Sequence, residues 1–342
     1  CEGACVYHHM EERPVTIALL QRYATDFAMK KKIQFFAPGK PTGKNVAVIG
    51  AGPSGLACAH ELRVLGHAVT VFEAKNILGG LNTWGIAEYK MGKDVSLYEV
   101  QMILDLGVEV RENTPVTPEM LPKLEKVFDA IFVGIGLGET NALKIPGEDL
   151  PGVRDALSFI EEIKMKPLHT VDVGRRVAVI GAGNTAVDAA TQAKRLGAEW
   201  VAMVYRRGEE DMSAYEYEYD LTKKDGVIFY FQTAPTRVIG NGAVAGLECV
   251  KMALGAPATA GRPDAKGKPS MTPVPGSEFT IPVDMVIKAV GQQKQVGFLS
   301  HVKGPKYFSG GDCANGGKEV VNATAEGKRA ARGIHAFLGG KT

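Results

Sequence analysis

The stretch 45–74, NVAVIGAGPSGLACAHELRVLGHAVTVFEA, holds a complete β-α-β pattern. Apolar runs at 46–49 and 68–72 predict two buried strands, and the residues between them predict a glycine loop and a helix that ends near residue 65. Gly50, Gly52 and Gly55 form G-x-G-x-x-G where the first strand meets the helix. The first glycine permits the turn, the second lets backbone approach a pyrophosphate, and the third lets helix pack on strand. The stretch therefore predicts a Rossmann-like dinucleotide-binding unit.

The residues around this loop extend the predicted site. Glu73 ends the second strand about 20 residues after Gly52, where a carboxylate can accept both ribose hydroxyls of an adenosine. The alternative is a tight turn with an incidental surface glutamate, and residues 79–80 could equally be a plain loop. The further candidate cofactor-binding residues of this unit are Pro53, Ser54, Ala74, Lys75, Gly80 and Leu81.

The stretch 176–207, RVAVIGAGNTAVDAATQAKRLGAEWVAMVYRR, repeats the pattern. Its loop is G-x-G-x-x-A, formed by Gly181, Gly183 and Ala186, and its second strand ends in Arg206 and Arg207 instead of a carboxylate. Guanidinium groups pair with a 2′-phosphate, which favours NADPH over NADH, although NADH stays possible. Two solvated arginines are the alternative. Asn184 and Thr185, which open the helix, complete this candidate site. An acidic first unit and a basic second unit predict FAD in the first and NADPH in the second.

The C-terminal stretch 305–337 predicts a strand, a Gly-Gly-Asp turn and a helix, which is too little for a separate domain. It must complete the first domain, so we expect an α/β protein with two Rossmann-like dinucleotide-binding domains, the NADPH domain inserted in the FAD domain. The expected FAD-binding domain is 45–148 with 285–342, and the expected NADPH-binding domain is 149–284. A helix and a Pro- and Gly-containing linker occupy 1–44.

The Gly-Gly-Asp turn supplies a second set of candidate flavin contacts. Asp312, after Gly311, can hydrogen-bond a ribityl chain, and the helix that begins at Glu319, Val320 and Val321 can stabilise negative charge on a reduced flavin. An Asx turn with a helix N-cap is the alternative interpretation. Gly291 is a further candidate cofactor contact.

Composition excludes several classes of protein. The 40 Lys and Arg residues nearly balance the 38 Asp and Glu residues, so there is no basic face for nucleic acid. No apolar run is long enough for a membrane span and no signal peptide opens the chain, so we expect a cytoplasmic protein with no membrane partner. The five cysteines include no CxxC, which argues against a thiol-disulfide reductase. No hydrolase or P-loop motif is present, and the hydride chemistry requires no catalytic side chain.

Several segments together resemble a known family. GGLNTWGIAEYK at 79–90, VYRRGEEDMSA at 204–214 and GGDCANGGKEVVNATAEGKRAA at 310–331, with both glycine loops, resemble the FAD- and NADPH-binding electron-input module of glutamate synthase small subunits and dihydropyrimidine dehydrogenases. The likeness is strongest to small subunits of bacterial dihydropyrimidine dehydrogenases. The resemblance implies a hetero-oligomer in which a partner subunit, carrying FMN and iron-sulfur clusters, reduces uracil or thymine to 5,6-dihydropyrimidines.

The resemblance also implies [4Fe-4S] clusters in an N-terminal helical domain, of which 1–44 would be the last part. Cys1 and Cys5 would be its final two cysteine ligands, and Gln21 matches the glutamine that replaces a cysteine in the dihydropyrimidine dehydrogenase branch. The other ligands would lie before residue 1. Two alternatives stay open: a glutamate synthase small subunit or flavin-based transhydrogenase subunit, and a non-catalytic dinucleotide sensor.

Overall fold

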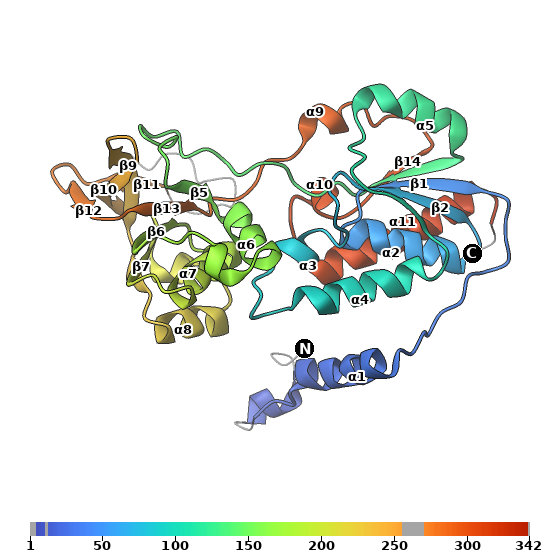
Figure 1. Cartoon of the computed structure of the whole chain (residues 1–342), viewed down its shortest axis with the longest axis horizontal. Helices are drawn as coiled ribbons and strands as arrows, with labels where there is room; N and C mark the ends of the chain where they lie inside the picture. Colours follow the sequence, from blue (N-terminus) through green and yellow to red (C-terminus); the bar gives the residue numbers. More distant parts are fainter. Residues whose placement is uncertain (1–4, 11–12, 255–269, 341–342) are drawn as a thin grey trace.

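A computed structural model describes residues 5–10, 13–254 and 270–340 of the 342-residue chain. It contains two five-stranded parallel sheets, one built on each predicted β-α-β unit, and a smaller antiparallel sheet. Figure 1 shows the two parallel sheets in separate domains joined by two connecting segments. The predicted α/β class with two Rossmann-like domains is confirmed.

The first domain has the strand order β14-β4-β1-β2-β3, with all pairs parallel. Because β14 pairs with β4, the C-terminal stretch completes the first domain, and the second unit is an insertion. The strands are β1 (Asn45–Ile49), β2 (Ala68–Phe72), β3 (Glu109–Arg111), β4 (Ala130–Val133) and β14 (Tyr307–Ser309). The helices are α2 (Pro53–Val64), α3 (Leu81–Trp84), α4 (Lys93–Leu104), α5 (Leu121–Val127), α9 (Val296–Leu299), α10 (Asp312–Asn315) and α11 (Val320–Phe337).

Side chains of β1 alternate between the two faces of this sheet, as a strand buried on both sides requires. Val46 and Val48 pack in a core with α2, α4 and α11, while Ala47 and Ile49 pack in another core with α5. Figure 1 shows helices on both faces of the sheet, α5 on one and α2, α4 and α11 on the other. Since α2 and α11 pack against each other, the predicted turn at 310–312 lies beside the glycine loop.

The second domain has the strand order β5-β13-β6-β7-β8, again with all pairs parallel. Its strands are β5 (Val153–Asp155), β6 (Arg176–Ile180), β7 (Trp200–Val204), β8 (Ile228–Tyr230) and β13 (Met285–Lys288), and its helices are α6 (Ala156–Met165), α7 (Asn184–Arg195) and α8 (Glu216–Lys224). The expected boundary after residue 284 is misplaced, because β13 pairs with β6 and so belongs to the inserted domain.

One face of the second sheet is covered by strands instead of helices. Val177 and Val179 face α6 and α7, whereas Ala178 and Ile180 face the antiparallel sheet. That sheet consists of β9 (Thr233–Gly240), β10 (Val244–Leu254), β11 (Met271–Pro273) and β12 (Phe279–Ile281). Short 3-10 turns occur at η2 (Val6–Met10), η3 (Pro118–Met120), η4 (Leu168–Thr170) and η5 (Glu209–Asp211).

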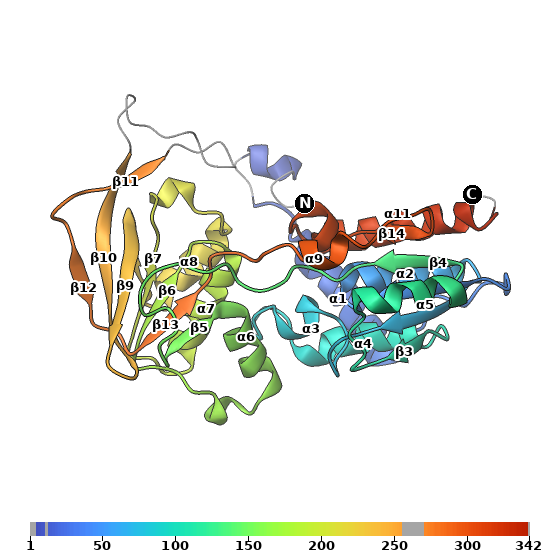
Figure 2. The same cartoon turned by 90° about the horizontal axis from the view of Figure 1, so that it is seen from above.

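The two segments that connect the domains pair with each other. The backbone N–H of Gly138 donates to the Gln293 carbonyl at 2.7 Å, and that of Asn141 donates to the Gly291 carbonyl at 2.9 Å. Residues 138–141 and 291–293 thus form a paired connection, called the hinge below, which runs between the domains in both views (Figures 1 and 2).

Helix α1 (Ile17–Lys31) precedes the first domain and joins it through an extended segment. In the described part of the chain, no helix is both long and apolar enough to cross a bilayer.

Candidate nucleotide-binding sites

The first glycine loop is shaped by close backbone contacts. The N–H of Gly50 donates to the carbonyl of Phe72, the last residue of β2, at 2.8 Å, and Gly50 has a φ of 98°. A Cβ atom on Gly55 would lie 1.9 Å from the Gly50 carbonyl oxygen. Positive φ and missing Cβ space are both conditions that only glycine meets. The loop leads directly into the N-terminus of α2, where backbone N–H groups are available to an anion.

Two other segments approach this loop and form a cradle with it. A Cβ atom on Gly80 would lie 2.7 Å from the Gly52 Cα, and one on Gly311 would lie 2.6 Å from the Ser54 Oγ. Both Gly80 and Gly311 have positive φ, at 57° and 77°. The structure thus brings together three predicted segments that are far apart in the sequence, and the bare backbone surface fits a pyrophosphate. Pro53 opens α2 and Leu81 opens α3 at the same place.

Glu73 faces the loop, as the carboxylate role requires. Its Oε2 accepts the N–H of Ala51 at 2.8 Å and its Oε1 accepts the N–H of Lys75 at 2.9 Å. A carboxylate offers about four acceptor positions, so capacity for ribose hydroxyls is left. Ala74 is exposed beside it. The Lys75 ammonium turns away from the cradle, pairs with Glu161 and lies 3.8 Å from the centre of the Trp84 ring.

Asp312 and the start of α11 lie on the far side of the cradle. The Asp312 Oδ1 accepts the N–H of Lys318 at 3.2 Å, and burial raises the pKa of this carboxyl. Val320 and Val321 are exposed, so the N-terminus of α11 is accessible. The Glu319 carboxylate accepts the hydroxyl of Tyr215 at 2.7 Å, a contact between the two domains that the sequence did not indicate.

The second glycine loop opens into a cavity of about 720 Å³, called the loop cavity below. The N–H of Gly181 donates to the carbonyl of Val204, the last residue of β7, at 3.1 Å. Gly183, Thr185, Arg206 and Gly291 line the cavity together with Gly181. A volume of this size suits a bound nucleotide.

Three predicted residues of this unit have different surroundings. Arg207 is only 4% exposed and is not part of the cavity wall, so only the Arg206 side chain is presented to a ligand there. The Asn184 Oδ1 accepts the N–H of Tyr215 at 3.2 Å, and Ala186 is fully buried under the loop.

The structure adds cavity residues that sequence reasoning missed. Thr140, Asn141 and Gln292 come from the hinge, and Ser213 comes from the segment after β7. Of these, only Ser213 could have been found from the sequence, because it lies within the VYRRGEEDMSA segment that resembles the family. No sequence pattern pointed to the hinge residues, because only the folded chain brings them to the loop.

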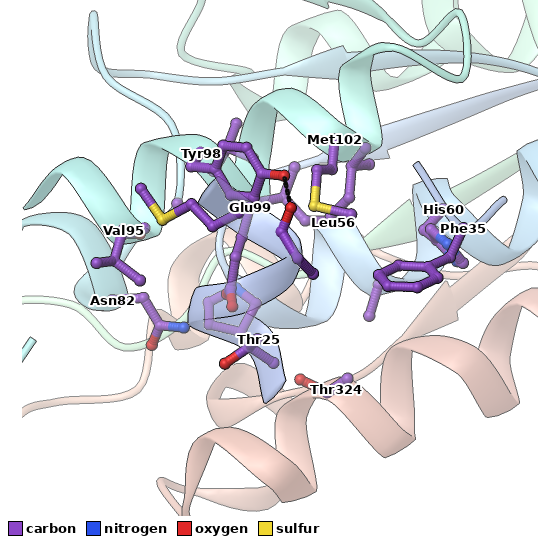
Figure 3. Close-up of a pocket in the computed structure, with 18 of the residues that line it drawn as sticks. Thr25, Phe35, Leu56, His60, Asn82, Val95, Tyr98, Glu99, Met102 and Thr324 are labelled. Carbon is purple, nitrogen blue, oxygen red and sulfur yellow. Dashed lines mark hydrogen bonds between the residues drawn. The ribbon is translucent and has the colours of Figure 1, made fainter. Parts of the chain in front are cut away.

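A second cavity, of about 480 Å³, lies where α1 and its linker approach α2, α4 and α11 (Figure 3). Its wall is mostly apolar, but Asn82 Oδ1 and His60 Nδ1 are buried without a hydrogen-bond partner. Burial lowers the pKa of His60 and raises that of Glu99. The Tyr98 hydroxyl donates to the Ala28 carbonyl of α1 at 3.5 Å, which ties α1 to this wall.

The predicted iron-sulfur ligands do not form a site in the described residues. Cys1 lies outside them, Cys5 is half-buried, and Gln21 is exposed on α1. Within 5–10, 13–254 and 270–340 there is no group of three or more His, Cys, Asp or Glu residues that could hold a metal ion. These residues therefore do not fit a cluster by themselves. Cys58, Cys249 and Cys313 are buried free thiols.

Curated relatives match almost the whole chain. It is 33% identical over 386 residues to the NADP(+)-dependent formate dehydrogenase subunit beta of Moorella thermoacetica, covering 99% of this chain but 53% of that protein. It is 35% identical over 375 residues to the glutamate synthase [NADPH] small chain of Escherichia coli, covering 99% of this chain and 78% of that one. The chain thus spans about half the length of the first relative.

Solved structures agree on the fold. Mycobacterium tuberculosis FprA in complex with NADPH superimposes with a TM-score of 0.70 at 20% identity, covering 88% of this chain and 85% of that one. Thioredoxin reductase of T. acidophilum gives 0.62 at 17% identity, covering 86% and 99%. A family profile described as "Pyridine nucleotide-disulphide oxidoreductase" matches residues 44–306. The chain therefore belongs to the pyridine nucleotide-disulphide oxidoreductase family.

Proposed function

We propose that the chain is the electron-input subunit of a larger oxidoreductase, which oxidises NADPH through FAD and passes the electrons to a partner subunit. One observation carries the proposal: two nucleotide-type glycine loops share one chain, and the first faces a carboxylate, Glu73, while the second faces a guanidinium, Arg206. FAD, when bound, accepts a hydride from NADPH and can release the electrons one at a time.

The first cradle supplies the contacts that FAD requires. The N-terminus of α2 and the bare backbone of Gly52 and Gly80 would hold the pyrophosphate, and Glu73 would accept the ribose hydroxyls. Asp312 would hydrogen-bond the ribityl chain, and the accessible N-terminus of α11 would stabilise negative charge on the flavin.

The loop cavity supplies the contacts for NADPH. Gly183 and Thr185 at the start of α7 would hold its pyrophosphate, and Arg206 would pair with its 2′-phosphate. The names of three relatives, a formate dehydrogenase subunit, a glutamate synthase small chain and an NADPH-Fe(3+) oxidoreductase subunit, also include NADP or NADPH.

The partner is a finer proposal. The segments at 79–90 and 310–331 and the position of Gln21 support a subunit that reduces the 5,6 double bond of uracil or thymine. A glutamate synthase large subunit is the second candidate, favoured by the 35% identity to a small chain. Copurification separates them: a partner with uracil-dependent NADPH oxidation supports the first candidate, and a glutamine-hydrolysing partner contradicts it.

The test of the core proposal is an anaerobic visible spectrum of the purified chain, titrated with NADPH and separately with NADH. We expect a flavin band, FAD on release by heat, and bleaching at lower NADPH than NADH concentration. A chain that takes up no flavin after reconstitution would refute the electron-input role and favour a dinucleotide sensor. Bound flavin that neither nucleotide bleaches would refute the NADPH assignment.

A further inference from the structure

We infer that Tyr89 and Lys90 are positioning residues that clamp the NADPH domain onto the FAD domain and so fix the relative placement of the two nucleotide sites. The inference rests on the proposed function. It starts from residues 85–92, the segment between α3 and α4, which reaches from the FAD domain to the side of α6, α7 and α8. In both views α3 lies next to α6 (Figures 1 and 2).

Lys90 is the centre of the clamp. Its Nζ lies 2.6 Å from the Asp188 Oδ1 of α7 and 2.7 Å from the Glu218 Oε1 of α8. Asp188 and Glu218 are buried, at 6% and 3% exposure. One ammonium group therefore pairs with two buried carboxylates from the other domain and offsets part of their combined charge. Without it these two carboxylates would face each other in a poorly solvated place, which is strongly unfavourable.

Tyr89 contributes a neutral bond to the same carboxylate. Its hydroxyl donates to the Asp188 Oδ1 at 2.9 Å, and the Arg195 guanidinium lies 4.5 Å from the centre of its ring. Burial, followed by the Asp188 charge, raises the pKa of Tyr89 far above its ordinary value, so the hydroxyl stays a donor at any physiological pH.

Lys164 of α6 reaches in the opposite direction. Its side chain is fully buried, and its Nζ donates to the Met91 carbonyl at 2.7 Å and lies 3.4 Å from Glu88. Each domain thus inserts a lysine into the other. On the other side of the interface the hinge connects the domains covalently, so clamp and hinge together restrict rotation.

The clamp connects the two nucleotide sites through short, rigid elements. The segment 85–92 follows α3, whose N-cap is Gly80 of the FAD cradle. Asp188, Gln192 and Arg195 lie along α7, whose N-terminus borders the loop cavity. Gripping the side of α7 therefore sets where the proposed pyrophosphate-binding end of that helix lies relative to the cradle. None of the clamp residues lines the loop cavity, so nucleotide affinity and placement can be tested separately.

The test uses the full chain with Lys90→Met and, as a matched control, Lys44→Met, because Lys44 pairs with Asp129 inside the FAD domain. We expect K90M to keep its flavin content and its NADPH dissociation constant within about twofold, while the rate of flavin reduction by NADPH falls at least about tenfold. K44M should match the parent in all three. Adding Glu218→Gln to K90M should recover part of the rate, since it removes one uncompensated carboxylate.

Small-angle X-ray scattering of the apo chain gives a readout that does not depend on bound flavin. We expect a larger radius of gyration for K90M than for the parent and for K44M, with an unchanged far-ultraviolet circular dichroism spectrum. An unchanged radius in K90M would overturn the clamp. If the parent binds no nucleotide, the proposed function fails while scattering still decides the clamp. If K90M loses secondary structure, the same measurements are made on Tyr89→Phe and Lys90→Arg instead. A radius of gyration in Y89F equal to that of the parent then counts against the clamp.

Discussion

The two β-α-β units use the same loop geometry but present different chemistry to it. In each, the first glycine donates its N–H to the carbonyl that ends the second strand, Phe72 in one unit and Val204 in the other. The residues that follow these strands differ: Glu73 turns back and bonds the loop, whereas Arg206 is exposed at the loop cavity. If the first loop holds FAD and the second holds NADPH, as proposed, the glycines would provide the phosphate site and the residues after the second strand would select the nucleotide.

The units also differ in how tightly the helix packs on the loop. At the third position of the motif, Gly55 leaves no room for a Cβ atom, whereas Ala186 fits and is fully buried. The first loop is further enclosed by Gly80 and Gly311. In the second loop, a Cβ on Gly181 would lie 2.3 Å from the Ala289 carbonyl oxygen, but one on Gly183 would meet only the Ser213 Oγ, at 3.3 Å. A closed cradle suits a cofactor that stays bound, and an open one suits a substrate that leaves.

Among the variants that test this comparison, Gly55→Ala should have the largest effect. It changes the G-x-G-x-x-G motif of the first loop into the G-x-G-x-x-A motif of the second. The new Cβ would meet the Gly50 carbonyl oxygen, so helix α2 must shift, and we expect a loss of roughly 1–3 kcal/mol in the free energy of unfolding together with loss of flavin. Chemical denaturation and the flavin-to-protein absorbance ratio measure both. Gly297→Ala is the control, since a Cβ there meets no atom within 4 Å. Equal stability of the two variants would contradict the packing argument.

The second-largest effect is expected for Glu73→Gln, which should weaken FAD binding. The amide keeps the shape but loses the charge-assisted bonds to the ribose and to the Ala51 N–H, which corresponds to about 1.5–3 kcal/mol, or roughly one to two factors of ten in affinity. Reconstitution of apoprotein with FAD, followed by flavin fluorescence, measures the dissociation constant. The exposed Glu112→Gln should leave it unchanged. An NADPH dissociation constant that changed as much as that of FAD would assign Glu73 to the wrong nucleotide.

Arg206→Ala tests the same comparison at the second loop. Removing the guanidinium should raise the NADPH dissociation constant roughly tenfold and leave that of NADH nearly unchanged, because only NADPH carries the 2′-phosphate. Anaerobic titration of flavin bleaching with each nucleotide measures the ratio. Arg175→Ala, whose partner Glu199 lies on the same domain surface, is the control. An equal loss for both nucleotides would show that Arg206 does not read the phosphate.

Asp312→Asn should have the smallest effect. Unlike Gly55→Ala, it should stabilise the folded chain. Burial raises the pKa of Asp312, so its contribution to stability is present below the unfolded pKa and is lost as pH rises through the folded pKa. At pH 7 the neutral amide should therefore raise the Tm of the apo chain, by ~1–3 °C, and the gain should vanish in acid. Thermal unfolding at pH 7 and pH 3.5 tests this. A variant that is less stable at pH 7 would contradict the assigned cause.

Much of the fold follows from local sequence pattern. The apolar runs at 46–49 and 68–72 became β1 and β2, and positive φ or close packing excludes a side chain at the loop positions Gly50, Gly55 and Gly181. The insertion was predictable because the segment after residue 305 is too short to fold alone. The boundary after residue 284 was wrong because β13 is a short apolar run, and only its pairing with β6 shows to which sheet it belongs.

Side-chain direction was less predictable than position. Lys75 follows the cradle strand as expected but pairs with Glu161 of the other domain, and Arg207 is buried although it neighbours the exposed Arg206. Tyr89 and Lys90 lie in a segment that carried a family likeness, yet nothing local distinguishes them from surface residues. Their partners are Asp188 on α7 and Glu218 on α8, which lie about 100 and about 130 residues further along the chain.

The sequence by itself determined the two glycine loops and the opposite charges beside them, because a tight turn and a charge at a strand end each depend on a few neighbouring residues. Only the tertiary structure decided which segments enclose each loop and how one domain is held against the other. Those features depend on contacts between residues far apart in the chain, whose partners are set by the packing of helices and sheets and not by any local pattern.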